Sequence, residues 1–308
     1  MNRLKLWYYP NGYTPIHDAA GYPDCVPFCE AGRMKWVDWV SVDQAEYFYC
    51  GQIPDFVPNP FDTSVFPMLK DCPERHIVDL EGDYRPGTFR QEFDGCIRSA
   101  SGAPPAWRNE MVFARPTLSM MLQQIVREDQ HFDWPAPTSR TWFFRGKPDA
   151  AGVRLKMRDA CHAAGVPCVV AMVPHWNGPA PAGSAVHEVF KVIMRESTVA
   201  LCPQGEGVAT ARFYEACAMG RFPVVIGETL LLGHDHFDTG FCVQLSAHLS
   251  TEDLAAEFNR LNQMSLAEMV ERGRAAQEYF DTIVRPYFAD PTAAFITWLR
   301  RRLTPPNK

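Results

Sequence analysis

After residue 140 the chain alternates strand-like and helix-like segments with a regular rhythm, and this alternation limits the folds open to it. The apolar segments TWFFRG, VPCVVAMV, TVALCP and FPVVIG read as strands, and FCVQL reads as one more. Between them, residues 150–164, 183–196 and 209–220 read as helices, and further helices begin near residue 251. Strands that alternate with helices in this way form βαβ units, in which helices cover both faces of a parallel sheet. We therefore expect an α/β fold.

The first third of the chain carries shorter strand signals, which segments rich in proline and glycine interrupt. The strand candidates are LKLWYY, WVDWVSVD, AEYFYC, HIVDL, CIRSAS and MVFA, and a helix-like stretch follows near residues 117–129. Residues 133–140, DWPAPTSR, have the prolines and polar residues of a linker. We therefore expect an N-terminal domain over residues 1–132, a second domain over residues 133–285 and a terminal helix over residues 286–308.

Composition and charge argue against several classes of protein. With 46% apolar and 21% charged residues, the chain has the make-up of a globular protein with a sizeable core. Its net charge of −6 argues against a nucleic-acid binder, and it has no run of about 18 apolar residues to predict a transmembrane helix. The N-terminus lacks the apolar run of a secretory signal, so we expect a cytoplasmic protein. The arginines of WLRRRL could touch the inner face of a membrane, or simply end a solvated helix.

The ten cysteines leave two interpretations open. Cys25 and Cys29 have the spacing of half a metal site, but the sequence offers no second close pair and no nearby histidine pair to complete it. Most of the others lie in apolar contexts, such as Cys202 in VALCP and Cys217 in YEACAMG. We expect buried, reduced thiols and no bound metal.

Residues 198–228 carry the strongest chemical signal in the chain. They read as a buried strand, a glycine-bearing turn, an amphipathic helix and a second buried strand. Gly205, Gly207 and the hydroxyl of Thr210 come just before the helix starts. Such a turn offers unpaired N–H groups and a positive helix end to an anion, although glycines at this place also serve plain turn geometry.

Two charged residues on the first turn of that helix extend the signal. Arg212 offers a planar guanidinium fork for phosphate, and Glu215 offers carboxylate acceptors for sugar hydroxyls. Alternatively, the two side chains pair with each other in an exposed i,i+3 bridge worth roughly 0.3 kcal/mol. Together with the glycine turn, they predict a site for a nucleotide-activated sugar.

The carboxyl ends of neighbouring parallel strands meet at one edge of a sheet, where ligands bind in such folds. Arg145 and Gly146 end the strand WFFRG, so we expect them beside the glycine turn. Arg145 is a candidate second phosphate ligand or a solvated strand end, and Gly146 would allow a close approach. Arg154 and Arg158, one turn apart on the next helix, could add positive charge or remain solvated.

The run STVALCPQG followed by ATARFYEACAMGRFPVVIG resembles the donor-binding signature of exostosin-like glycosyltransferases. That signature has a strand ending in Cys-x-Pro-x-Gly, a helix with Ser/Thr-x-Arg-x-x-Glu-Ala, and Gly-x-x-Pro-Val. The upstream TWFFRGKPDAAGVRLKMRDAC is similar to the strand and Arg-bearing helix of that family, and AEYFYCGQ and HIVDLEGDY are similar to first-domain segments. The resemblance is good over residues 140–230 and weaker over residues 1–130.

The resemblance implies a GT-B architecture, in which two Rossmann-like domains with parallel sheets face each other across a cleft. The C-terminal domain would bind the donor and the N-terminal domain the acceptor, and the terminal helix would cross back to the N-terminal domain. It implies that Arg212 and Thr210 hold the donor diphosphate, that Glu215 holds the ribose, and that Arg145 contacts the phosphates from the other side. It also implies that no metal and no cofactor are needed beyond the nucleotide-sugar donor, for which a UDP-sugar is favoured. The chain departs from the family at Gln204, where many relatives carry Arg.

We therefore expect a glycosyltransferase of polysaccharide biosynthesis that moves a sugar, with inversion, to a hydroxyl of a glycan or lipid-linked saccharide acceptor. Arg212 would stabilise the leaving diphosphate. Glu81 or Asp83, in the acidic turn after HIVDL, is the candidate base, with His17 and Asp18 next, although such acids often only cap turns. The alternatives are an epimerase or hydrolase of nucleotide sugars, and a catalytically silent nucleotide-sugar-binding module.

Overall fold

The computed structural model describes residues 3–13, 37–53, 66, 68, 70–80, 96–99, 112–114, 119–149, 152–173, 185–205, 210–228 and 237–303. The chain divides into two compact units. The first consists of Met1–Pro116, Leu230–Asp235 and Pro286–Lys308, and the second of Thr117–Thr229 and His236–Arg285. The domain limits expected from the sequence, and the assignment of donor and acceptor sides, stay predictions.

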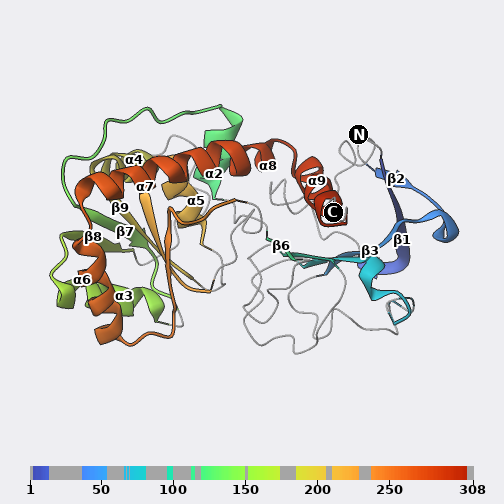
Figure 1. The fold of residues 1–308 in the computed structure, drawn as a ribbon, viewed down its shortest axis with the longest axis horizontal. Coiled ribbons are helices and arrows are strands. Elements are labelled where there is room, and N and C mark those ends of the chain that lie inside the picture. Colours follow the sequence, from blue (N-terminus) through green and yellow to red (C-terminus); the bar gives the residue numbers. More distant parts are fainter. Residues whose placement is uncertain are drawn as a thin grey trace, which may run out of the picture. The chain divides into compact units, whose positions relative to one another are not determined.

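The first unit contains a parallel sheet with the strand order β2-β1-β3-β4-β5-β6 (Figure 1). Its strands are β1 (Leu4–Tyr13), β2 (Val37–Trp39), β3 (Tyr47–Ile53), β4 (His76–Leu80), β5 (Cys96–Ser99) and β6 (Val112–Ala114). Short 3-10 turns lie at Val42–Gln44 and Pro73–Arg75, and helix α9 (Pro291–Leu303) groups with this unit. Each strand matches a segment predicted from the sequence.

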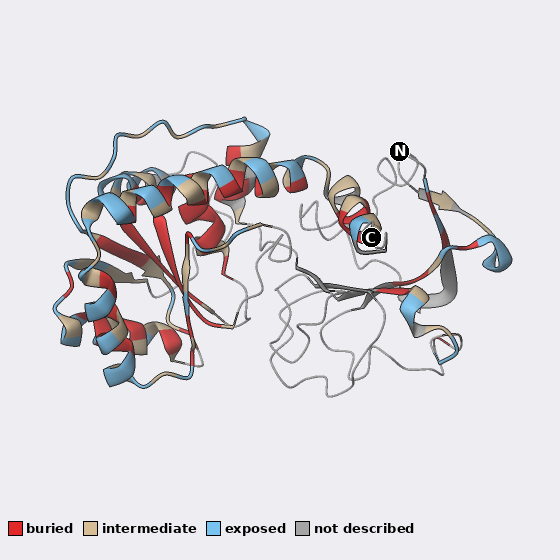
Figure 2. Cartoon of the chain, viewed as in Figure 1, coloured by how far each residue is buried: buried red, intermediate tan, exposed pale blue. Residues whose placement is uncertain are grey.

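The second unit contains a parallel sheet with the strand order β11-β10-β9-β7-β8. Its strands are β7 (Trp142–Gly146), β8 (Cys168–Met172), β9 (Val199–Pro203), β10 (Phe222–Ile226) and β11 (Val243–Leu245). Every residue of β9 and β10 is buried, as Figure 2 shows by their colour. Central strands of a parallel sheet are covered on both faces, which explains their continuous apolar sequences.

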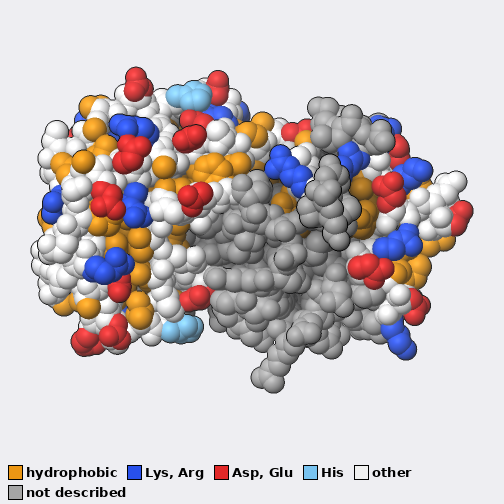
Figure 3. Space-filling model, viewed as in Figure 1, with side chains coloured by type: hydrophobic (Ala, Val, Ile, Leu, Met, Phe, Trp, Pro, Cys, Tyr) orange, Lys and Arg blue, Asp and Glu red, His pale blue; other side chains and the backbone are white. Residues whose placement is uncertain are grey.

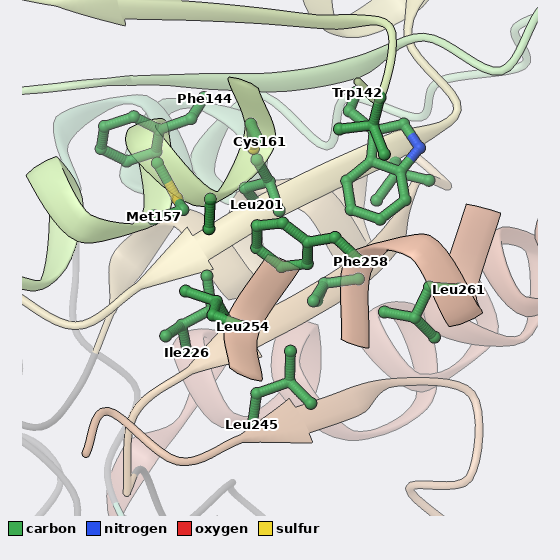
Figure 4. Close-up of a cluster of buried hydrophobic side chains, with 14 of the residues drawn as sticks. Trp142, Phe144, Met157, Cys161, Leu201, Ile226, Leu245, Leu254, Phe258 and Leu261 are labelled. Carbon is green, nitrogen blue, oxygen red and sulfur yellow. The ribbon is translucent and has the colours of Figure 1, made fainter. Parts of the chain in front are cut away.

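Helices cover both faces of this second sheet. Its helices are α2 (Met120–Arg127), α3 (Val153–Ala164), α4 (Ala185–Glu196), α5 (Ala211–Ala218), α6 (Thr251–Asn262) and α7 (Leu266–Tyr279), and a π-helical turn (Phe280–Val284) leads into α8 (Arg285–Ala289). On one face, α3 and α6 pack on the sheet: Trp142 and Phe144 of β7 share a buried core cluster with Met157 of α3 and Phe258 of α6 (Figure 4). On the opposite face, α4, α5 and α7 contact the strands. The α/β fold with parallel sheets, predicted from the alternation, is confirmed.

The described part of the chain contains no helix that is both long enough and apolar enough to cross a membrane.

On the face drawn in Figure 3, the Lys and Arg side chains of the second unit lie interspersed with Asp and Glu side chains. This mixture agrees with the net charge of −6 and gives no continuous basic surface over the described residues of that face.

Candidate functional site

The carboxyl ends of β7, β9 and β10 lie at one edge of the second sheet, because β9 pairs in parallel with both other strands. This edge therefore carries Arg145 and Gly146 at the end of β7 and Gly205 after β9, as expected from the sequence, and also Glu228 after β10. The backbone N–H of Glu228 lies 3.4 Å from Oε1 of Gln204, so the segments after β9 and β10 contact each other.

Helices α3 and α5 begin at this edge, and their N-termini differ. At the start of α3, the Asp149 carboxylate accepts hydrogen bonds from the backbone N–H groups of Val153 (2.9 Å) and Arg154 (2.8 Å). At the start of α5, the N-cap residue Thr210 is buried and extended, and its side chain makes no capping hydrogen bond. The positive end of α3 is thus already satisfied by a carboxylate, whereas that of α5 has no cap from its own N-cap side chain.

Arg212 lies in a tight, partly buried cluster. Its Nη1 pairs with the Glu215 carboxylate, and its Nη2 donates to the backbone carbonyl of Arg145 at 2.9 Å. The guanidinium carbon lies 4.1 Å from the ring centre of Phe190 on α4. The side chains of Arg212 and Glu215 are only 19% and 7% exposed. The two residues therefore do pair, as the alternative from the sequence allowed, but in a partly buried place rather than an exposed one.

This pairing bears on the roles predicted for Arg212 and Glu215. Two of the terminal N–H groups of Arg212 are engaged within the protein, and its buried Nε has no hydrogen-bond partner among the described residues. Glu215 accepts from Arg212 in this arrangement, so a ribose would have to share or displace that bond. The roles of Arg212, Thr210 and Glu215 toward a ligand stay predictions.

Arg154 reaches the same edge from α3. Its Nη1 donates to the Lys147 carbonyl at 2.7 Å, and its Nη2 would lie 2.6 Å from a Cβ added at Gly205. Gly205 is therefore needed so that the guanidinium can lie against the turn after β9. Arg158, one turn further along α3, instead makes an exposed pair with Asp159. The structure thus separates two arginines that the sequence left equivalent.

At Gly146, the absence of a side chain makes room for a neighbouring residue of the protein. A Cβ at this position would lie 2.6 Å from the ring tip of Phe144, two residues earlier in β7. The close approach at Gly146 is therefore made by a side chain of the protein itself. Its place on the predicted edge is as expected, and its role toward a ligand stays a prediction.

Three further residues make contacts at this edge that we did not predict from the sequence. Asp149 caps α3, and its signal was present, since an acidic residue often precedes a helix start. Lys147 supplies the carbonyl that fixes Arg154. Ser246, just after β11, donates to Oε1 of Glu228 at 2.7 Å, a contact between distant segments with no local signal.

Several predicted residues lie outside the described residues. These are the candidate bases Glu81 and Asp83, the glycine Gly207, the first-loop residues His17 and Asp18, and the cysteines Cys25 and Cys29. Within the described part of the chain, no three His, Cys, Asp or Glu side chains gather in a way that could hold a metal ion.

No protein-family model matches the sequence, and no curated protein matches it either. Among solved structures, one described as TarM aligns at a TM-score of 0.39 and 10% identity over 78% of this chain and 57% of that chain. A mutant of S. aureus TarM in complex with fondaparinux, alpha-GlcNAc-glycerol and UDP aligns at a TM-score of 0.38 and 8% identity, over 78% of this chain and 58% of that chain. The chain therefore spans less than two thirds of each. TM-scores below 0.5 do not establish a common fold.

Proposed function

We propose that this protein is a glycosyltransferase that takes its sugar from a nucleoside-diphosphate donor bound at the carboxyl edge of the second sheet. The observation that carries the proposal is the start of α5. There, the Thr210 side chain does not cap the helix, and the helix follows shortly after Gly205, against which the guanidinium of Arg154 lies. A diphosphate is the ligand that such a combination of N–H groups and fixed positive charge favours. The resemblance of this segment to exostosin-like donor sites points to a sugar on that diphosphate.

In the proposed reaction, the bond between the sugar carbon and the diphosphate oxygen breaks as an acceptor hydroxyl attacks that carbon. The leaving diphosphate gains negative charge, which the fixed positive charge of Arg154 and the positive end of α5 would stabilise. The Arg212–Glu215 pair holds Arg145 and α5 in place for this task. Glu81 or Asp83 remains the proposed base that takes the acceptor proton.

The finer features of the proposal follow from the resemblance. They are a GT-B arrangement of two Rossmann-like domains, a UDP-sugar donor, inversion at the sugar carbon, and a glycan or lipid-linked saccharide as acceptor. A cytoplasmic location belongs to the same set of proposals.

Thermal-shift measurements with UDP, GDP, CMP, TDP and their sugar conjugates test donor binding. One nucleotide at 100 times its dissociation constant should stabilise the wild type by about 2.7 kcal/mol. Arg154→Ala should weaken that nucleotide roughly tenfold to a hundredfold, because a hydrogen bond to a charged group is worth about 1.5–3 kcal/mol. Arg158→Ala is the matched control, since Arg158 lies on the same helix in an exposed pair, and it should bind as the wild type does.

Equal binding by the Arg154→Ala and Arg158→Ala variants would remove Arg154 from the site. No shift with any nucleotide would contradict donor binding to the free protein.

Once a donor is found, its consumption is followed with and without saccharide acceptors. Release of free sugar without acceptor would instead indicate a hydrolase, an altered sugar with the nucleotide retained would indicate an epimerase, and binding without any consumption would indicate a silent module.

A further inference from the structure

Glu228 lies at the same edge of the sheet as the Gly205 turn, directly after β10. Strand β9, the Gly205 turn, helix α5 and strand β10 form one βαβ unit, because β10 pairs in parallel with β9. Glu228 comes 24 residues after Gln204, the residue just before that turn. In nucleotide-binding βαβ units, the diphosphate lies at the start of the helix, and an acidic residue about 20 residues after the glycine turn holds a ribose hydroxyl. Glu228 occupies the corresponding place in this unit.

The backbone just before Glu228 is fixed from both sides. On the β11 side, the backbone N–H of Gly227 donates to the Leu245 carbonyl at 2.9 Å, and Nε2 of Gln244 donates to the Gly227 carbonyl at 3.0 Å. On the β9 side, a Cβ added at Gly227 would lie 2.7 Å from Oε1 of Gln204, so the glycine lets that side chain lie against the turn. Glu228 is therefore presented from a well-anchored strand end.

The side chain of Glu228 is oriented by Ser246. The Ser246 hydroxyl donates to Oε1 of Glu228 at 2.7 Å, and its oxygen accepts from the backbone N–H of His248 at 3.2 Å. The N–H of His248 thus directs the hydroxyl proton toward the carboxylate. Glu228 is partly buried rather than enclosed. A carboxylate can accept about four hydrogen bonds, so the bond from Ser246 still allows it to accept from the neighbouring hydroxyls of a ribose.

Glu215, the residue predicted from the sequence to hold the ribose, is less suited to that role. Its side chain is only 7% exposed, and it pairs with Arg212. A ribose at Glu215 would have to share or displace an ion pair. The described hydrogen bond to the Glu228 carboxylate comes instead from a neutral hydroxyl, which a ribose hydroxyl can join without the loss of that ion pair.

We propose that Glu228, oriented by Ser246, holds the ribose hydroxyls of the donor nucleotide. The inference rests on the proposed donor site, and it adds the group by which that site selects a ribonucleoside diphosphate. The diphosphate lies at the start of α5, and the carboxylate at the end of the neighbouring strand accepts from the 2′- and 3′-hydroxyls. A nucleotide without these hydroxyls keeps the phosphate contacts and loses those to Glu228.

The test compares UDP and GDP with their 2′,3′-dideoxy forms in calorimetric titrations of the full chain. The wild type should bind the ribonucleotide roughly tenfold to a hundredfold more tightly than its dideoxy form, because hydrogen bonds to a charged group are lost with the hydroxyls. In Glu228→Ala this preference should disappear, while the affinity for the dideoxy form stays that of the wild type. Glu271→Ala removes an exposed carboxylate of α7 and should keep the full preference. Arg154→Ala should weaken both forms equally, because they share the diphosphate.

Circular dichroism checks the fold of each variant, and Glu228→Gln, which keeps the shape of the side chain, serves if Glu228→Ala does not fold; it should reduce the preference. An unchanged preference in both Glu228 variants would overturn the assignment and leave the donor site standing. Loss of the preference in Glu215→Gln alone would return the ribose to Glu215. Equal binding of the two forms by the wild type would also overturn the assignment. No binding of either nucleotide would contradict the proposed function, and this assignment with it.

Discussion

Arg212→Ala should lower the free energy of unfolding of the second unit by about 3 kcal/mol, because it leaves the Glu215 carboxylate buried without its partner. The substitution also removes the hydrogen bond to the Arg145 carbonyl and the contact with the Phe190 ring. For a unit of this size, each kcal/mol lowers the melting temperature by roughly 2–4 °C, so the expected loss is about 6–12 °C. Calorimetry and urea unfolding followed by circular dichroism measure the effect.

The double variant Arg212→Ala with Glu215→Gln separates the buried charge from the lost contacts. A neutral amide costs less to bury than an unpaired carboxylate, so the double variant should recover part of the lost stability. Arg195→Ala is the control, because Arg195 makes an exposed pair with Glu196 and should change stability by less than about 0.5 kcal/mol. A loss below about 1 kcal/mol in Arg212→Ala would mean that the pair does not hold the edge of the sheet.

This effect on stability changes how the predicted catalytic role of Arg212 must be tested. A loss of sugar transfer by orders of magnitude in Arg212→Ala counts for a phosphate role only below the melting temperature of the variant, where its fold is intact. Normal transfer under those conditions would contradict the phosphate role predicted for Arg212 from the sequence and leave only its proposed role of positioning Arg145 and α5.

The sequence was sufficient to predict the helices and strands of the second unit and the sheet edge that carries the proposed site. Continuous apolar segments such as TVALCP and FPVVIG became the buried central strands β9 and β10, because a strand covered on both faces needs no polar side. Parallel pairing then brings the strand ends together, so the neighbourhood of Arg145, Gly205 and Arg212 followed from topology alone. The strands, and the edge at which their ends meet, therefore follow from the pattern of apolar segments along the chain.

The contacts within the site could not be predicted in the same way, because they join distant segments. Spacing allowed Arg212 to pair with Glu215, but the Arg145 carbonyl that fixes the guanidinium is contributed from 67 residues away. The choice between Arg154 and Arg158 depends on how α3 is rotated against the turn at Gly205, which packing with α6 and the sheet decides. Helical periodicity gives the spacing of side chains but not the absolute direction in which they point.

Gly273→Ala should lower the free energy of unfolding of the second unit by about 2–3 kcal/mol, although alanine is normally better than glycine within a helix by about 1 kcal/mol. Gly273 is buried in α7. A Cβ there would lie 2.5 Å from the backbone oxygen of Gly220 and 3.3 Å from the backbone nitrogen of Phe222. Backbone atoms cannot rotate away as a side chain can, so α7 must move off the sheet. Urea unfolding measures the loss.

The reason for this close approach lies in how α5 ends. Gly220 has a φ of +63°, and the N–H groups of Gly220 and Arg221 donate back to the carbonyls of Cys217 and Ala216, which stops the helix just before β10. Arg274→Ala is the matched control on α7, because it removes only an exposed pair with Glu271 and should stay within about 0.5 kcal/mol of the wild type. If Gly273→Ala were instead as stable as the wild type or more so, helix propensity would outweigh packing, and α7 would not lie against the Gly220 turn as closely as the structure has it.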